Sequence, residues 1–380
     1  MKILLCFGTR PEAIKMAPLY HELLKTTFEV KVCVTAQHRE MLDQVLNFFE
    51  IVPDYDLDVM QPNQTLNGLS ANILTKMDVV LNDAKPDLVL VHGDTTTSSM
   101  VALAAFHLGI KVGHVEAGLR TYHKQAPFPE EINRQLTGRI ADIHFTPTKE
   151  ATQNLLKEGL LIKTILETGN TGIDALLWTV HKIEQTNYIH KEIEHLKTIL
   201  PIHKKLILVT SHRRENFGEG FKNLCEALLE ISKRDDVVIV YPVHLNPNVK
   251  DIVYEILANK HNIYLVPPVS YPAFVWLMQQ SFMIVTDSGG IQEEAPSLGK
   301  PVLVTRTVSE RPEGITAGFS TLVGTDKVKI VKETTNLLEN FKGFNDIVNP
   351  YGDGKACERI VKYLGEIPRT SLPACPSERE

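Results

Sequence analysis

The 380-residue chain has few of the features that mark membrane or nucleic-acid-binding proteins. It has no apolar run long enough to cross a bilayer, and its apolar N-terminal run is too short for a signal peptide. Positive charge is also in short supply, since 40 Lys and Arg against 46 Asp and Glu give a formal net charge of -6. We therefore expect no membrane association and no nucleic-acid partner.

Cysteine is scarce and scattered. The five cysteines form no CxxC pair and show no spacing typical of zinc ligands. The segment HKEIEH at residues 190–195 differs from the HExxH zinc pattern and falls on an amphipathic stretch, so its histidines are expected at the surface. The sequence thus predicts reduced thiols, no metal site and a cytoplasmic protein.

Several familiar catalytic and phosphate-binding patterns are missing as well. Neither GxGxxG nor GxxxxGK[ST] occurs, so the usual dinucleotide and Walker loops are absent and no cofactor is expected. No GxSxG elbow supports a serine nucleophile. A phosphate ligand would have to be held by arginine and lysine side chains or by a glycine-rich helix start.

The chain does contain a regular alternation of short β-rich apolar runs and longer segments of helical period, which is typical of parallel sheets covered by helices. The first series of runs is KILLCFG, EVKVCVT, DLVLVHG, KVGHVEA, DIHFTPT and ILETGN. The second is KLILVTS, DVVIVYPV, NIYLVPP, FMIVTD and PVLVTR. The length favours two domains, and each series predicts a Rossmann-like half in an α/β protein.

We place the N-terminal domain at 1–170, the C-terminal domain at 171–362 and a polar tail at 363–380. The stretch from about 170 to 205 lacks strand character. It holds four apolar residues spaced for one helical face: Ile189, Ile193, Leu196 and Leu200. A final helical segment, ACERIVKYLGEI, is expected to cross back onto the first domain.

Polar clusters follow the predicted strands, where open parallel sheets bind their ligands. In the first half, Asp94 and Glu116 come directly after apolar runs, and Glu130 lies in PFPEEINR. Each acid alone is more simply read as a solvated loop residue. Together they favour a site in which carboxylates divide acid and base roles.

In the second half, DSGGIQEE places Ser288, Gly289 and Gly290 where a helix should begin, a pattern that suits an anion or a plain N-cap. Glu294, one turn later, suits either ribose hydroxyls or solvent. His212 and His244 are read as a turn or cap residue, or as groups that contact phosphate or move a proton. Arginines and a lysine at strand ends in both halves suggest a pyrophosphate clamp, although each alone fits a surface ion pair.

These motifs together resemble the non-hydrolysing UDP-N-acetylglucosamine 2-epimerases of bacteria. The resemblance spans residue 1 to about 362. It rests on GTRPEAIKMAP, TAQH, VHGDTTT, HVEAGLRT, PFPEEINR, GNTGIDAL, SHRREN, YPVHLNP, TDSGGIQEEAP, GKPVLV and SERPEG. It implies the GT-B fold, two Rossmann-like domains facing a cleft, usually in a homodimer. It also implies interconversion of UDP-GlcNAc and UDP-ManNAc, which supplies ManNAc-derived sugars for surface polysaccharide.

The resemblance also assigns roles by motif. The implied catalytic residues are Asp94, Glu116, Glu130 and His212, with His212 acting at the departing diphosphate. The implied UDP-binding residues are Arg10, Lys15, Phe274, Ser288, Gly289, Gly290, Glu294 and Arg311. Phe274 would lie beside uracil, although from the sequence alone it is more simply a core aromatic.

Many members of the family bind a second UDP-GlcNAc as an activator. The positions that match this allosteric site are Gln37, His38, Glu131, Arg213 and His244. Asn63 departs from an arginine that some activated members carry. The alternatives are a hydrolysing relative that releases ManNAc and UDP, a GT-B glycosyltransferase that needs an acceptor, and a non-catalytic sugar-nucleotide sensor.

Overall fold

The computed structural model describes residues 1–36, 39–61, 63–185, 188–201, 203–309, 311–344 and 348–367. The chain forms two compact units, one built from 1–175 with the chain from 351 onward, the other from 176–350. The division between Ala175 and Leu176 falls inside the continuous helix α7 (Thr171–Glu184), whereas the sequence analysis placed the domain boundary at 170. An unbroken helix leaves no loop signal at this point.

The first unit is organised around a seven-stranded parallel sheet with the order β3-β2-β1-β4-β5-β6-β7. The order reverses between β1 and β4, as in Rossmann folds. The strands are β1 (Lys2–Phe7), β2 (Glu29–Val34), β3 (Tyr55–Asp56), β4 (Leu88–His92), β5 (Lys111–Val115), β6 (Ile143–Thr146) and β7 (Ile165–Glu167).

Helices connect these parallel strands. They are α1 (Arg10–Leu24), α2 (Arg39–Phe48), α3 (Leu66–Ala84), α4 (Thr96–His107), α5 (Glu130–Ile140), α6 (Lys149–Lys157) and the short 3-10 helix η1 (Ile162–Thr164), whereas α7 follows the last strand and continues into the second unit. Threonine side chains start several of them: Thr65, Thr95 and Thr148 each accept a hydrogen bond from a backbone N–H in the first turn of α3, α4 and α6.

The second unit repeats the same order in a six-stranded parallel sheet, β10-β9-β8-β11-β12-β13. Its strands are β8 (Lys205–Thr210), β9 (Val237–Pro242), β10 (Ile263–Val266), β11 (Met283–Thr286), β12 (Val302–Val304) and β13 (Ser320–Leu322). Its helices are α8 (Lys191–Ile199), η2 (Arg214–Asn216), α9 (Glu219–Ile231), α10 (Pro247–Leu257), α11 (Tyr271–Gln280), α12 (Gly289–Glu294), η3 (Ala295–Leu298), α13 (Pro312–Thr316) and α14 (Lys327–Asn340).

The sheet of the second unit is buried on both faces because successive side chains of its strands enter different cores. In β8, Ile207 and Val209 join a core with α9, α10 and α14, while Leu206 and Leu208 join a core with α8 and α11. Strands of this kind are continuous apolar runs, which is why the sequence showed them so clearly. All eleven predicted strands are present, and β3 and β13 are additional short edge strands.

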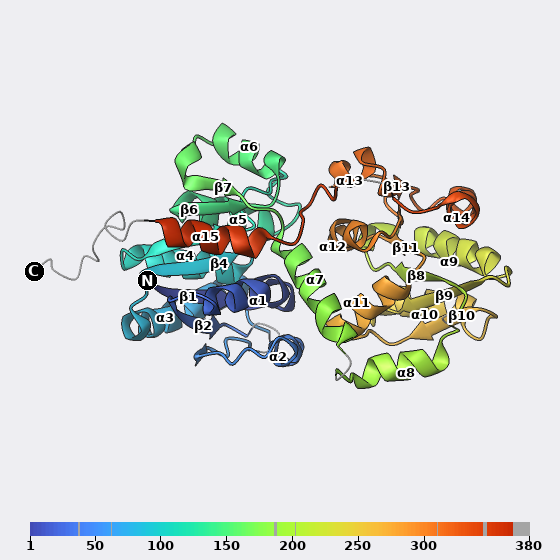
Figure 1. The fold of residues 1–380 in the computed structure, drawn as a ribbon, viewed down its shortest axis with the longest axis horizontal. Helices are drawn as coiled ribbons and strands as arrows, with labels where there is room; N and C mark the ends of the chain where they lie inside the picture. The colour runs from blue at the N-terminus through green and yellow to red at the C-terminus, as the bar shows by residue number, and fades with distance from the viewer. Residues whose placement is uncertain are drawn as a thin grey trace, which may run out of the picture. The chain divides into compact units, whose positions relative to one another are not determined.

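The last helix, α15 (Ala356–Glu366), belongs to the first unit and packs against α1 (Figure 1), which confirms the predicted return of the chain. Asp174 anchors it: its two carboxylate oxygens accept the backbone N–H groups of Ala356 and Cys357, at 3.2 and 2.9 Å. The helix continues to Glu366, past residue 363 where the polar tail was predicted to begin.

One local prediction is wrong. Ile193, Leu196 and Leu200 are buried as expected, but Ile189 precedes α8 and is 78% exposed, so it is not part of the apolar face. His195 is exposed as predicted, whereas His190 is half-buried. In the described part of the chain no helix is both long and apolar enough to cross a membrane. Among the same residues, no group of three His, Cys, Asp or Glu is arranged to hold a metal ion.

Candidate active site

The candidate residues of the first unit gather at the carboxyl edge of its sheet, where β1, β4 and β5 are neighbours. Gly8 follows β1, Asp94 follows β4 and Glu116 follows β5. Gly8 has to be glycine because a Cβ there would lie 2.0 Å from Thr35 Oγ1, which hydrogen-bonds Thr97 Oγ1 at 2.7 Å. The start of α1 lies next to the loop after β4, because Thr95 Oγ1 donates a hydrogen bond to Glu12 at 2.7 Å.

Glu116 is held in an unusual backbone conformation, with φ at 61°, a region that non-glycine residues rarely adopt. Its carboxylate forms an ion pair with Lys15 from α1, 101 residues away in sequence, and both side chains are largely buried. A Cβ on Gly93 would lie 3.8 Å from Glu116 Oε1, so the carboxylate runs along the backbone of the β4 loop.

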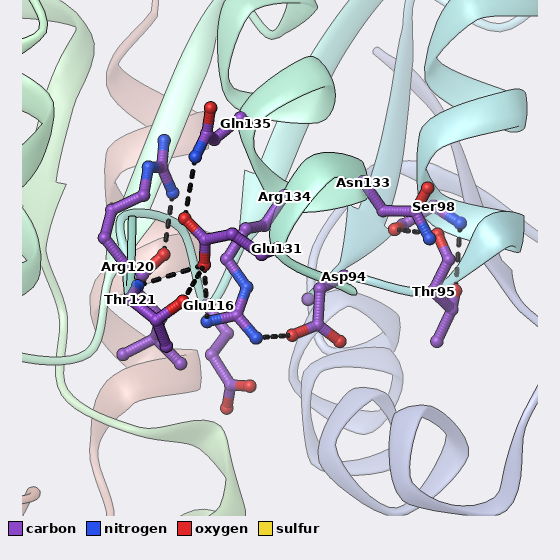
Figure 2. A network of polar contacts seen from close by, with 12 residues as sticks. Asp94, Thr95, Ser98, Glu116, Arg120, Thr121, Glu131, Asn133, Arg134 and Gln135 are labelled. Carbon is purple, nitrogen blue, oxygen red and sulfur yellow. Dashed lines mark hydrogen bonds and ion pairs between the residues drawn. The ribbon is translucent and has the colours of Figure 1, made fainter. Parts of the chain in front are cut away.

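Arg134 of α5 connects two acids (Figure 2). It forms an ion pair with Asp94 at 2.5 Å and approaches Glu131 at 3.6 Å. Burial raises the pKa of Asp94, the positive charge of Arg134 opposes this, and the negative charges of Glu116 and Glu130 add to it. Glu130 begins α5, and its Oε2 is buried without a hydrogen-bond partner among the described residues. The charges of Glu116 and Glu130 therefore both act on the carboxyl group of Asp94.

Glu12 joins two loops of this edge. One of its oxygens accepts hydrogen bonds from Gly8 N at 3.1 Å, Thr9 N at 2.8 Å and Thr9 Oγ1 at 2.8 Å. The other oxygen accepts a hydrogen bond from Oγ1 of Thr95, the residue after Asp94, at 2.7 Å. Burial raises the pKa of Glu12 to about 7, although all these hydrogen bonds act to lower it.

Two buried histidines behind the acids are held neutral. Burial lowers the pKa of His92, the last residue of β4, to about 4, with Lys15 adding to the effect and Glu116 opposing it. His92 Nε2 lies 3.7 Å from Glu116 Oε2 and has no hydrogen-bond partner in the described structure. Burial likewise lowers the pKa of His114 to about 3, while its Nε2 contacts Gly93 O at 2.7 Å.

In the second unit the equivalent edge is where β8 and β11 are neighbours. His212 follows β8, and its ring stacks on that of His244 with centroids 5.5 Å apart and planes 17° apart. Asp287, directly after β11, is fully buried and accepts hydrogen bonds from the loop that carries His212. Burial lowers the pKa of His212, and the charge of Asp287 opposes this.

Arg311 and the first turn of α12 form a second group in this unit. Ser288 is the N-cap of α12, and Gly289 and Gly290 form its first turn. A Cβ on Gly289 would lie 3.6 Å from Arg311 Nη2, so the guanidinium packs against the helix start, where it also pairs with Glu293. This group joins a cation to a helix N-terminus, a combination suited to phosphate.

The remaining predicted residues divide by location. Phe274 is partly buried against the second unit's core and Glu294 ends α12. Arg10 is exposed at the first position of α1. Glu131 is fully buried and accepts hydrogen bonds from Thr121 N (Figure 2) and from Tyr122 N, both at 3.0 Å. Gln37 and His38 lie outside the described residues.

Sequence reasoning did not single out Glu12, His92, Arg134 or Asp287. A signal existed for two of them: Thr9-x-x-Glu12 is a capping-box spacing, and Arg134 follows Glu130 by four residues on one helix. For His92 and Asp287 the sequence shows only a polar residue at a strand end. Their contacts reach across the sheet, to residues that single-sequence patterns do not connect.

The family model for UDP-N-acetylglucosamine 2-epimerase matches residues 21–365. The UDP-N-acetylglucosamine 2-epimerase of Escherichia coli strain K12 is 55% identical over 369 residues, which cover 96% of this chain and 98% of that protein. The crystal structure of the Neisseria meningitidis UDP-GlcNAc 2-epimerase bound to UDP-GlcNAc is 50% identical, with a TM-score of 0.87 over 97% of this chain and 100% of that one.

A more distant solved structure has the same fold. The Methanocaldococcus jannaschii UDP-GlcNAc 2-epimerase, in complex with UDP-GlcNAc and UDP, is 34% identical with a TM-score of 0.80, over 96% of this chain and 99% of that one. These likenesses extend over nearly the whole chain. The chain therefore belongs to the UDP-N-acetylglucosamine 2-epimerase family, with its GT-B fold of two Rossmann-like units.

Proposed function

We propose that this protein reversibly epimerises UDP-GlcNAc at C2 of the sugar to give UDP-ManNAc, without hydrolysis. The family membership and the high identity to named UDP-GlcNAc 2-epimerases support the substrate class. The UDP-GlcNAc bound to the Neisseria relative supports a nucleotide-sugar site on this fold. The product would supply ManNAc-derived sugars for surface polysaccharide.

The chemistry requires elimination because the proton at C2 has no adjacent carbonyl to make it acidic. A base removes the C2 proton while the C1–O bond breaks, its electrons leave with UDP, and C1 and C2 become doubly bonded in 2-acetamidoglucal. UDP then adds back to C1 and an acid delivers a proton to the opposite face of C2. This route needs carboxylates on both faces and cations for the departing diphosphate.

The cluster of three acids in the first unit is the observation that carries the proposal. Asp94, Glu116 and Glu130 come from different strand and helix ends, yet the charges of Glu116 and Glu130 both act on Asp94. Burial raises the pKa of Asp94, which pairs with Arg134, whereas Glu116 pairs with Lys15. Two acids in unlike surroundings are what a paired acid and base need.

Binding of UDP is proposed for the basic groups. Arg311 with the first turn of α12, and Arg10 with Lys15 at the start of α1, offer guanidinium, ammonium and backbone N–H donors to phosphate oxygens. His212 would donate to the departing diphosphate. Phe274 and Glu294 would contact uracil and ribose.

Turnover of UDP-GlcNAc in deuterated water, followed by NMR, tests the reaction. The proposed route places deuterium at C2 and yields UDP-ManNAc in equilibrium with UDP-GlcNAc. Free ManNAc with UDP would instead identify a hydrolysing enzyme. If neither product forms and no deuterium enters C2, the protein is a non-catalytic sugar-nucleotide sensor. A binding titration with UDP-GlcNAc would then show binding without turnover.

We also propose a homodimer and activation by a second UDP-GlcNAc. Sedimentation tests the first, and a sigmoidal rate dependence on UDP-GlcNAc tests the second. Glu131 allows a specific test of the allosteric proposal, because its carboxylate already accepts hydrogen bonds from the backbone N–H groups of Thr121 and Tyr122. A direct contact between Glu131 and the activator requires those hydrogen bonds to break, so activation should be accompanied by lost protection of the Tyr122 amide.

A further inference from the structure

Asp287 organises the loop that follows β8, although it lies about 75 residues further along the chain. Its Oδ2 accepts hydrogen bonds from Ser211 Oγ at 2.7 Å, His212 N at 2.9 Å, Arg213 N at 2.9 Å and Asn216 Nδ2 at 3.3 Å. Its side chain is fully buried. One carboxylate oxygen therefore fixes the backbone on which His212 stands.

The second oxygen of Asp287 has a different neighbour. Oδ1 is buried and has no hydrogen-bond partner among the described residues, and it lies 3.6 Å from Nδ1 of His212. A buried carboxylate oxygen left without a donor is costly. A proton on Nδ1 makes this contact attractive, whereas an unprotonated Nδ1 would turn its lone pair toward a negative oxygen.

The orientation of the imidazole is restricted from another side as well. The ring of His244 stacks on that of His212, with the planes 17° apart, so rotation of the His212 ring out of its plane is hindered. Asp287 Oδ2 holds the backbone of His212, His244 restricts its ring plane, and Nδ1 of His212 faces Asp287 Oδ1. The nitrogen left for other partners is Nε2.

We propose that Asp287 is a positioning residue for His212: it holds the neutral imidazole as the Nδ1–H tautomer and presents Nε2 as the nitrogen that exchanges a proton with the substrate's diphosphate. In the cationic ring the Nε2–H donates to a phosphate oxygen, and that proton passes between the two atoms. The Nδ1 proton stays on the ring and Asp287 stays ionised. The catalytic part rests on the proposed function, but the tautomer does not.

The charged and titratable groups facing His212 are Asp287, His244 and Arg213. Burial lowers the pKa of His212 most, His244 and Arg213 lower it further, and Asp287 alone raises it. Loss of the Asp287 charge should therefore make the His212 cation harder to form. The limb of the pH–rate profile that requires this cation should shift to lower pH in Asp287→Asn.

Nitrogen-15 NMR of histidine-labelled protein at high pH tests the tautomer directly, with His212→Gln used to assign the signal. We expect the Nδ1–H form in the wild type. In Asp287→Asn the side-chain oxygen should keep the loop donors, so the amide –NH₂ faces Nδ1 and the proton should move to Nε2. Ser211→Ala, which removes one donor to Oδ2 only, should keep the wild-type tautomer.

Kinetics test the positioning role. Asp287→Asn should lower kcat by at least about tenfold while KM changes less than about threefold, because the imidazole stays in place but has the wrong tautomer and a cation that is harder to form. Asp326→Asn, which alters the N-cap of α14 in the same unit, serves as the matched control and should change kcat by less than about twofold.

The outcomes separate cleanly. A wild-type His212 in the Nε2–H form overturns the proposal, even if Asp287→Asn fails to fold. An unchanged tautomer or an unchanged kcat in a folded Asp287→Asn also overturns it. If the wild type has no epimerase activity, the proposed function fails, while the NMR result still decides whether Asp287 sets the tautomer.

Discussion

The two sheets have the same strand order. In each, a buried carboxylate accepts the backbone N–H groups of the loop that follows a central strand. In the first unit Glu12 accepts the N–H groups of Gly8 and Thr9, in the loop after the first strand. In the second unit Asp287 accepts the N–H groups of His212 and Arg213, in the loop after β8. The acid comes from the next helix in one case and from a neighbouring strand in the other.

The difference teaches that one topology can place unlike chemistry at its carboxyl edge. In the first unit Glu12 of the next helix holds the loop after β1, and the acids at this edge pair with Lys15 and Arg134. In the second unit the loop is fixed across the sheet, and the residues presented are His212, His244 and Arg311. We therefore expect proton transfer at C2 to depend on the first edge, and the second edge to contribute nucleotide affinity and the proton transfer at the diphosphate.

The largest effect is expected for Glu116→Gln. An amide cannot exchange a proton with C2, so turnover should fall by about a thousandfold, and at least a hundredfold, while the Kd for UDP changes little. Steady-state rates and calorimetric titration with UDP measure the two quantities. Glu150→Gln, an exposed acid on α6, is the control and should keep wild-type turnover. Near-normal turnover in Glu116→Gln would remove the acid cluster from the chemistry.

Glu12→Gln tests the carboxylate that fixes the first loop, through stability. Native Glu12 holds its proton up to about pH 7, whereas the unfolded carboxyl releases it near its ordinary pKa of 4.5. The native state thus binds more protons in this window, and the Glu12 contribution to the free energy of unfolding falls as the pH rises through it. Between about pH 4.5 and 7, the free energy of unfolding of the wild type should fall by about 3 kcal/mol relative to that of Glu12→Gln.

Urea unfolding of both proteins at several pH values between 4.5 and 8 measures this difference. Subtracting the Glu12→Gln curve removes the titration of all other groups. Parallel curves for the two proteins would show that Glu12 titrates alike in the native and unfolded states. That result would leave the carboxylate ionised throughout, as its four hydrogen bonds favour.

A smaller effect is expected for Arg311→Met, on the second edge. Losing the guanidinium removes charge-assisted hydrogen bonds to phosphate, so the Kd for UDP should rise about tenfold or more. Arg234→Met removes a half-buried arginine of the same unit, paired with Asp236 and Glu339, and should leave that Kd unchanged. Unaltered UDP affinity in Arg311→Met would contradict the division of roles between the two edges.

How far the sequence predicts this molecule depends on the range of each interaction. The apolar runs of β1 or β8 announce strands because both faces of the sheets are buried, whereas β3 and β13 are edge strands of two and three residues with little pattern. The Glu12 contact to Thr9 is local and has a recognisable spacing. The contacts of Asp287 to His212 and of Lys15 to Glu116 join distant segments, so only the folded chain reveals them.

The anchoring of α15 by Asp174 has a consequence for biosynthesis. The first unit takes its main segment and its closing helix from opposite sides of the second unit in the sequence. During translation the second unit is fully synthesised while the first still lacks a helix that covers α1. The first unit is thus completed only after the second has been synthesised, and until α15 emerges the surface of α1 that it covers stays exposed in the nascent chain.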